Sequence, residues 1–287
     1  MSLCLDILLV LGYYTFWVFV PLRAVFPAGG LPFFRPPPLL CSFFERCAVL
    51  EWLQSHILYI LLFIAAVFTF DWLYQCRAQL RLRWYSALIL AVLHVVVGVA
   101  CVRFFAFAEA GFDAEKAGNL SLFGGIIILP AFYFLGAKLT KRSVAAVFDV
   151  FTIPLAATLL LARINCFFGG CCLGKLIGET GMRWPTREAE LVFYAVFIVL
   201  TLPRVFKGRG KGEVYPLFMI AYGAFRAVDE CFRENPNYPG IFHLSHVWAF
   251  AVLALGILIL ILLRKRGASP AKDKRTAAKS SDRRNTK

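Results

Sequence analysis

Residues 162–174 carry the densest set of reactive side chains in the chain, at the end of a long apolar run. The segment reads Ala-Arg-Ile-Asn-Cys-Phe-Phe-Gly-Gly-Cys-Cys-Leu-Gly, so an arginine (Arg163) is followed by three thiols and three glycines. Glycine lets the backbone approach a ligand closely and turn through left-handed conformations. An arginine at a membrane edge is a ready partner for phosphate, which its planar guanidinium binds through paired hydrogen bonds. The segment therefore predicts a site for a polar, anionic group.

A second group of charges ends another apolar run. At 100° per residue, a stripe of roughly 80° on one helix holds Tyr222, Arg226, Glu230 and Arg233. Burying such charges against hydrocarbon costs several kcal/mol each, so the stripe must face protein or a watery cavity. Glu230 can pair with Arg226 and leave Arg233 partly free. Two interpretations stay open: a structural ion pair near the interface, or an anion site that Arg163 joins at the same membrane face.

The composition indicates which elements must position these residues. The chain is 60% hydrophobic and 17% charged, with a mean hydropathy of +0.71, whereas soluble domains carry roughly 25% charged residues. Several apolar runs approach the ~20 residues needed to cross a bilayer. We therefore predict an all-α, polytopic integral membrane helical bundle with seven or eight transmembrane helices, in one domain over residues 1–265. The predicted spans, the first read as a retained anchor, lie near 3–22, 48–70, 84–102, 121–137, 145–162, 190–206, 214–231 and 247–263.

Lysine and arginine in the short loops indicate the orientation. The basic loops follow alternate spans, and they share one side with the C-terminal segment if eight spans alternate, so that side is predicted to be cytoplasmic. The formal net charge of +14 is then mostly a topology signal, and we expect no nucleic-acid partner. Residues 266–287 are predicted to form a basic, disordered cytoplasmic tail that touches anionic lipid. Residues 163–189 lie on the opposite, extracytoplasmic face.

Cysteine spacing predicts no metal site. The chain has nine cysteines, an odd number, and neither a CxxC pair nor a His-Cys spacing typical of zinc. Cys166, Cys171, Cys172 and Cys231 could share one exterior layer, where a disulfide or simple apolar packing are both open. We expect no metal and no cofactor.

Two further candidates have equally simple structural explanations. Gly124 and Gly125 permit close contact between helices. Glu190, at the exterior start of a predicted span, is either a favourable helix N-terminal charge or part of a site.

Taken together, these residues resemble the prolipoprotein diacylglyceryl transferase family over roughly residues 95–265. Its first signature reads about G-R-x-G-N-F-x-N-G-E-x-x-G, and Arg163, Phe167, Gly170 and Gly174 keep its register. Its second, Y-G-x-x-R-F-x-x-E-x-x-R, is matched by Tyr222, Gly223, Arg226, Glu230 and Arg233. A third segment, H-P-[ST]-Q-L-Y-E, is echoed by Trp184-Pro185-Thr186 and Glu190.

The chain departs from the family at several positions. Asn165, Cys166, Gly169 and Cys171 replace family Gly, Asn, Asn and Glu. The family histidine before a Gly-Gly pair, a candidate base for the substrate thiol, is replaced by Phe123, and Trp184 replaces the H-P-[ST] histidine. The base would then have to be Glu190, Glu230, His246 or solvent, or the thiolate would form simply through nearby arginines.

The resemblance implies a membrane enzyme of the bacterial plasma membrane with a cytoplasmic C-terminus. It would move a diacylglyceryl group from phosphatidylglycerol to the lipobox cysteine of a prolipoprotein signal peptide, the first step of lipoprotein maturation. The implied catalytic residues are Arg163, Arg226 and Glu230. The implied substrate-binding residues are Arg233, Tyr222, Gly170, Gly174, Gly124, Gly125 and Glu190. Two alternatives stay open: a relative that binds phospholipid with altered or lost transferase activity, and an anion or lipid transporter.

Overall fold

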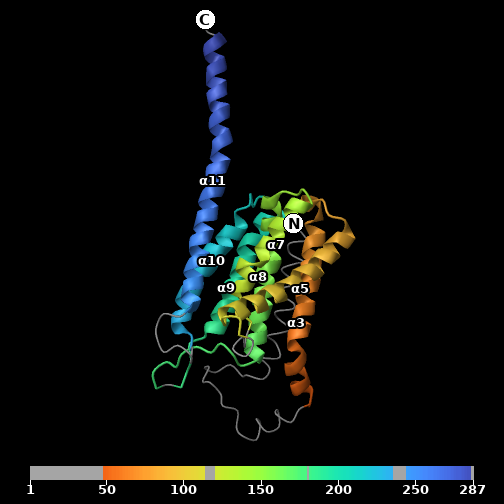
Figure 1. Ribbon diagram of the computed structural model, residues 1–287, viewed down its shortest axis with the longest axis vertical. Coiled ribbons are helices and arrows are strands. Elements are labelled where there is room, and N and C mark those ends of the chain that lie inside the picture. The colour runs from red at the N-terminus through yellow and green to blue at the C-terminus, as the bar shows by residue number, and fades with distance from the viewer. Residues whose placement is uncertain (1–47, 114–119, 180, 235–243, 286–287) are drawn as a thin grey trace.

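The computed structural model describes residues 48–113, 120–179, 181–234 and 244–285 (Figure 1). The predicted first span at 3–22 lies outside the described residues. The described chain is helical, and its helices are α3 (Ala48–Gln75), α4 (Arg77–Leu80), α5 (Trp84–Glu109), α6 (Phe123–Ile127), α7 (Leu129–Leu139), α8 (Val144–Phe168), α9 (Thr186–Phe206), α10 (Val214–Phe232) and α11 (Leu244–Asn285).

Five of the described helices are long and apolar enough to cross a membrane: α3, α5, α8, α9 and α11. The all-helical membrane bundle is confirmed, but a count of seven or eight spans is not. The predicted span at 121–137 is divided at Ile128 into α6 and α7, and Pro130 opens α7. The 19-residue α10 has the length of a span, but Arg226, Asp229 and Glu230 make it too charged to count as one by composition.

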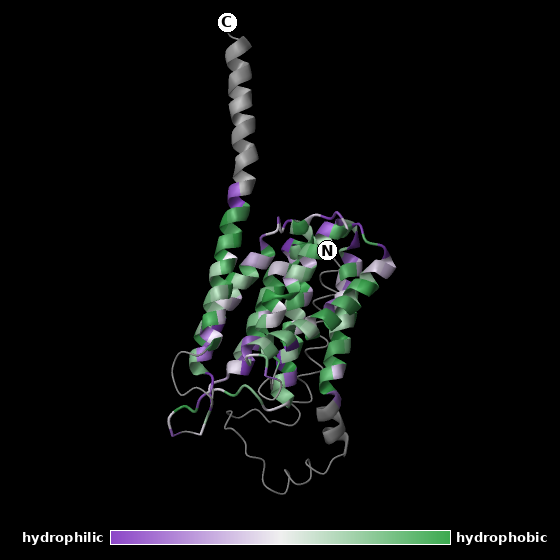
Figure 2. Ribbon diagram, in the orientation of Figure 1, coloured by the Kyte–Doolittle hydropathy of each residue, from purple (hydrophilic) through white to green (hydrophobic). Residues whose placement is uncertain are grey.

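Helix α8 forms the centre of the bundle. It packs against α9, α3 and α7, while α10 packs mainly against α11 (Figure 1). More than half of the apolar stretch of α8 is buried inside the protein, whereas a third or less is buried in the corresponding stretch of α3, α5, α9 and α11. Apolar residues cover the middle of the bundle and hydrophilic residues lie at its ends (Figure 2), as expected for helices whose backbone bonds are satisfied internally in lipid.

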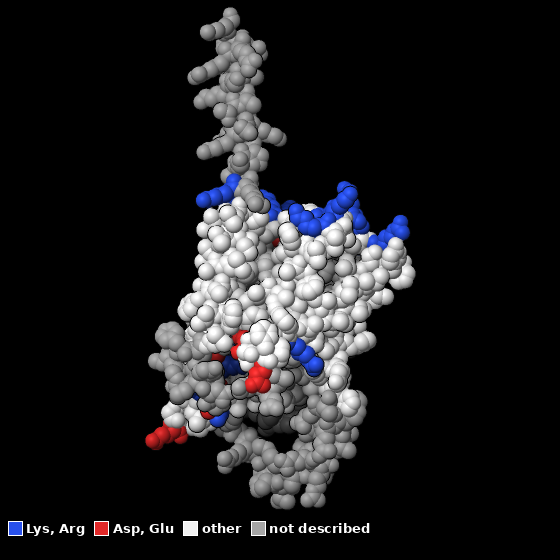
Figure 3. Space-filling view, in the orientation of Figure 1, with Lys and Arg blue, Asp and Glu red and all other residues white. Residues whose placement is uncertain are grey.

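Lysine and arginine gather at the end of the bundle from which α11 extends (Figure 3). This end holds the α9–α10 connection, where Arg204 pairs with Glu213 at 2.7 Å. The fold therefore agrees with the prediction that the basic loops lie on one side of the membrane. Helix α11 is assigned as far as Asn285. The division of the chain into a helical domain over 1–265 and a basic, disordered tail over 266–287 stays a prediction.

Candidate functional site

Three helices bring buried charges together at the end of the bundle opposite α11's extension. Glu190 lies in the first turns of α9 and pairs with an arginine from each of two other helices. Its Oε2 contacts Nε of Arg163 from α8. Its Oε1 lies 2.7 Å from Nη1 of Arg226 from α10. Arg226 also contacts Asp229 at 3.2 Å and Glu230 at 2.5 Å. All five residues are at most 5% exposed. We call Arg163, Glu190, Arg226, Asp229 and Glu230 the ion cluster.

The geometry resolves two of the open questions about this cluster. The predicted pairing of Arg226 with Glu230 is confirmed. Glu190 is not a simple surface charge at a helix N-terminus, because it joins guanidinium groups from two other helices. Arg233, 17% exposed, lies 3.8 Å from Glu230 and is the most accessible arginine of the set. With Arg233 included, three arginines face the three carboxylates of the ion cluster, so the formal charges of this group balance.

The loop after α8 closes over this region. Helix α8 continues past Arg163 to Phe168, so the expectation that Arg163 ends its helix is wrong by about one turn. Gly170 then adopts a φ of +63°, which favours glycine. Gly174 pairs with Arg233 in an isolated β-bridge, and a Cβ at Gly174 would collide with the carbonyl oxygen of Trp184. These predicted binding glycines therefore shape the loop that attaches to the end of α10.

Three thiols lie where the loop meets the ion cluster. The cysteines that the structure describes are all free, so no disulfide joins any of them. Nη1 of Arg163 lies 3.7 Å from Sγ of Cys172 and 4.0 Å from Sγ of Cys166. The pKa of Cys172 is lowered to about 4 by its hydrogen bond with Cys166 and, against the effect of burial, by the positive charges of Arg233 and Arg163. The positive charges of both arginines thus favour the thiolate form of Cys172.

Two buried tyrosines border the ion cluster. The rings of Tyr194 and Tyr222 stack with centroids 6.2 Å apart, and both residues are at most 1% exposed. Within the described part of the chain, neither hydroxyl has a hydrogen-bond partner. A buried hydroxyl without a partner is costly, so these groups are suited to a ligand. Tyr194 was missed by the sequence analysis, although it follows Glu190 by four residues and so lies on the same helix face.

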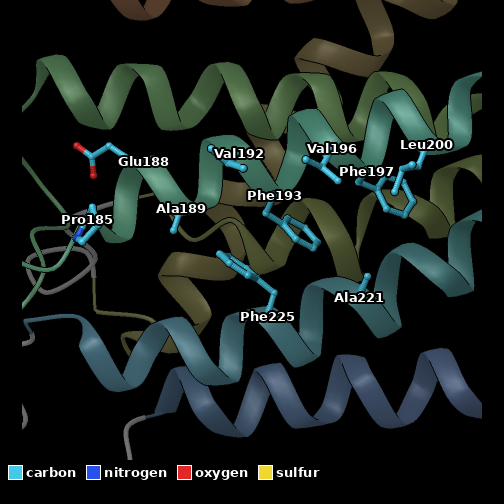
Figure 4. A pocket seen from close by; sticks show the side chains of 10 residues that line it. All are labelled: Pro185, Glu188, Ala189, Val192, Phe193, Val196, Phe197, Leu200, Ala221 and Phe225. Carbon is cyan, nitrogen blue, oxygen red and sulfur yellow. The ribbon is translucent and has the colours of Figure 1, made fainter.

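An open apolar groove of about 630 Å³ runs between α9 and α10 beside the ion cluster (Figure 4). Its residues come mostly from α9 and include Ala189, next to Glu190, while Phe225 of α10 precedes Arg226. The full lining is Pro185, Glu188, Ala189, Val192, Phe193, Val196, Phe197, Leu200, Ala221 and Phe225. The groove has the apolar lining expected for a site that holds a hydrocarbon chain.

The Gly124-Gly125 pair lies at a helix contact. A Cβ at Gly124 would collide with the backbone carbonyl of Cys101 in α5 and lie 2.7 Å from Cβ of Phe105, whereas one at Gly125 would meet only side chains, at 3.6 Å or more. Phe123 beside them is buried, with its ring 6.0 Å from that of Tyr222. Their contacts show helix packing; a direct role in binding substrate stays a prediction.

This packing yields a matched pair of variants. We expect Gly124→Ala to destabilise the protein by about 1–3 kcal/mol, because overpacking forces α6 away from the α5 backbone. Gly125→Ala should be close to neutral. Thermal unfolding in detergent micelles compares the two. Equal midpoints for both variants would contradict the packing role assigned to Gly124.

Comparison with known proteins agrees with this geometry. The family model for prolipoprotein diacylglyceryl transferases matches residues 53–262, well over half of the chain. The chain belongs to this family. The match to the prolipoprotein diacylglyceryl transferase family contains every residue of the ion cluster, of the groove and of the loop over residues 169–174, here called the thiol loop.

Curated relatives carry the name phosphatidylglycerol–prolipoprotein diacylglyceryl transferase. The relative from Photobacterium profundum is 26% identical over 160 residues, covering 50% of this chain and 60% of the relative. That from Yersinia enterocolitica is 25% identical over 190 residues, covering 53% and 65%. That from Oleidesulfovibrio alaskensis is 32% identical over 155 residues, covering 50% and 57%. The chain therefore spans about 57–65% of the length of these relatives.

Proposed function

We propose that this protein transfers an sn-1,2-diacylglyceryl group from phosphatidylglycerol to the lipobox cysteine of a prolipoprotein. The observation that carries the proposal is the meeting of Arg163, Glu190 and Arg226 from three helices, next to Arg233 and a lipid-facing groove. The relatives' names, which give phosphatidylglycerol and prolipoprotein, support the same substrates.

The reaction is a displacement at an sp3 carbon with phosphate as the leaving group. Charge accumulates on the departing phosphate oxygen, so preorganised cations and donors aimed at it lower the barrier. We assign phosphate contact to Arg163, whose Nη1 reaches the loop after α8, and to Arg233, the partly exposed arginine beside Glu230. Arg226 is held by three carboxylates and positions Glu190. The hydroxyls of Tyr194 and Tyr222 are available as donors.

The carboxylates keep the two buried arginines in place. Glu190 fixes Arg163 and Arg226 relative to one another, and Glu230 contacts both Arg226 and Arg233. A preformed array avoids reorganisation when the phosphate leaves. Because Glu190 and Glu230 are occupied by guanidinium groups, we assign them positioning roles and not that of the base that accepts the thiol proton.

The groove between α9 and α10 accommodates an acyl chain of the lipid. An acyl chain is already in apolar surroundings in the bilayer, so the groove contributes shape and position, with little hydrophobic transfer energy. We propose that the C-terminus is cytoplasmic in a bacterial plasma membrane, and the gathering of lysine and arginine at the end from which α11 extends supports this orientation. The ion cluster then lies toward the outer leaflet.

Blocking the groove should impair the enzyme selectively. We expect Val192→Trp, at a lining position that is 62% exposed, to lower kcat/KM for phosphatidylglycerol about tenfold, equivalent to ~1.4 kcal/mol. Val199→Trp is the control, because Val199 is also exposed on α9 but lies outside the groove lining. Steady-state kinetics in mixed micelles compares them. Equal losses of kcat/KM in both variants would contradict the proposal that the groove holds an acyl chain.

Transfer itself is tested with the purified protein. Phosphatidylglycerol labelled in its acyl chains is incubated with a lipobox peptide, and the peptide is analysed by mass spectrometry. A diacylglyceryl adduct on the cysteine peptide, and none on the same peptide with serine in place of cysteine, supports the proposal. Bound lipid without adduct would instead identify a phospholipid-binding relative, an alternative that the replacement of the family histidine by Phe123 favours.

A further inference from the structure

The end of α8 and the loop that follows it bring three thiols together. Sγ of Cys166, Cys171 and Cys172 all lie within 4.8 Å of one another, and the Cys171–Cys172 pair is 3.6 Å apart. A zinc–sulfur bond of about 2.3 Å requires neighbouring sulfurs roughly 3.8–4.0 Å apart in a tetrahedral or trigonal site. The three sulfurs therefore already have nearly the spacing of a tricysteine metal site.

Backbone geometry produces this juxtaposition. Cys166 lies in the last turn of α8, and the chain reverses through Gly170 and Cys172, with φ values of +63° and +62°. Cys171 donates through its thiol to the carbonyl oxygen of Cys166 at 3.8 Å. The spacing of these cysteines along the chain matches no metal motif, because their convergence depends on this reversal of the backbone.

The surroundings suit a thiolate-bound cation. Arg163 directs Nη1 at two of the sulfurs, 3.7 and 4.0 Å away, as outer-shell donors do for ligands of a metal. Three thiolates around a divalent ion carry a net charge of −1, which a neighbouring guanidinium favours. Soft sulfur ligands select zinc or copper(I) over magnesium or calcium. Cys171 is exposed and the other two are partly exposed, so the site is accessible from outside.

We propose that Cys166, Cys171 and Cys172 bind Zn²⁺ and that the open fourth position receives the thiol of the substrate cysteine. This inference rests on the proposed transferase function and supplies what that function lacks here, a means of forming the thiolate. Catalytic zinc sites keep three protein ligands and one open position, and a thiol that coordinates the ion is deprotonated outright.

The chemical step balances without a redox partner. On binding zinc, the substrate thiol releases its proton to solvent. A sulfur electron pair then forms the bond to the glyceryl carbon as that carbon's bond to the phosphate oxygen breaks. The electrons of the broken bond leave with glycerol-1-phosphate, beside Arg163 and Arg233. The zinc stays divalent, and the thioether product, a weaker ligand, dissociates.

Metal binding is measured first. Full-length protein is purified in a non-thiol reductant and titrated with Zn²⁺ alone, and separately with Co²⁺, whose sulfur-to-metal charge-transfer absorption reports thiolate ligands. One ion should bind per chain. Removal of a residue that only hydrogen-bonds a metal ligand costs about 10–100-fold in metal affinity. Cys166 and Cys172 are proposed as direct ligands, so Cys166→Ser and Cys172→Ser should each lower zinc affinity by more than about 100-fold. Cys231→Ser is the matched control, because Cys231 is a free, exposed thiol outside the cluster.

The outcomes of this titration are decisive. Absence of one-to-one binding by the wild type, absence of the charge-transfer band, or equal affinity of the Cys231→Ser and Cys172→Ser proteins would each overturn the zinc site. Cys171→Ser, at an exposed loop position, is a third variant that should fold if either of the others does not.

The role of the ion is measured second, with the lipobox peptide. The peptide with cysteine should shift the cobalt spectrum and the serine peptide should not. Chelation should reduce transfer at least tenfold, and added Zn²⁺ should restore it. Transfer that persists in metal-free protein would overturn the inference and leave the proposed function intact. Zinc binding and the peptide shift without any transfer would support the site and contradict the proposed function.

Discussion

Replacing Arg163 with alanine should reduce diacylglyceryl transfer to a lipobox peptide by about 10²–10³-fold, the loss typical of removing one preorganised transition-state donor. Arg163 is buried, is fixed by Glu190 and extends Nη1 to the thiol loop, so solvent cannot replace it. The fold should survive, because Glu190 keeps Arg226 as a partner. The loss of transfer should therefore appear in kcat, and the unfolding temperature should fall less than in the Glu190→Ala variant.

The control for this variant is an arginine at the other end of the bundle. Arg204→Ala removes a partly exposed arginine paired with Glu213 and should retain nearly full activity. Arg163→Lys should recover little activity, because an ammonium group cannot reproduce the planar, bidentate contacts of a guanidinium. Near wild-type transfer by Arg163→Ala would contradict the role assigned to this residue.

Replacing Glu190 with alanine should have the largest effect on stability, about 3–5 kcal/mol, because it removes one partner from a buried ion pair. Arg163 would be left without its carboxylate, while Arg226 would keep Asp229 and Glu230. We expect a clearly lower thermal unfolding midpoint in detergent micelles, together with loss of transfer.

A double variant separates this account from a general packing defect. Arg163→Ala combined with Glu190→Ala removes both the carboxylate and the arginine that depends on it. The double variant should therefore be more stable than Glu190→Ala alone. If the two substitutions simply add, the Arg163–Glu190 pair does not account for the stability of the cluster.

The features that could be predicted best from the sequence are those that follow from helical periodicity and from a residue's place at the end of an apolar run. Arg226, Glu230 and Arg233 share a helix stripe, and charges that cannot face lipid must meet other groups in the protein. The positions of Arg163 and Glu190 at the ends of their apolar runs indicated a common membrane face. What the sequence could not provide was the partner of each charge: Glu190's bridge between two helices depends on how α8, α9 and α10 pack.

Features that depend on chain reversal or on close packing were missed. The three thiols converge only because the loop turns back at Gly170 and Cys172. Gly124 and Gly125 look equivalent in sequence, yet only Gly124 lies against the backbone of α5. The span at 121–137 was predicted from hydropathy alone, which does not register the break at Ile128 ahead of Pro130.

The most direct measurement of the central claim is rescue of a bacterium whose own prolipoprotein diacylglyceryl transferase has been depleted. The account predicts that the wild-type chain restores growth and produces diacylglyceryl-modified lipoproteins by mass spectrometry, while an equally expressed Arg163→Ala variant does neither. No lipoprotein modification by well-expressed wild-type protein, or full rescue by Arg163→Ala, would contradict it.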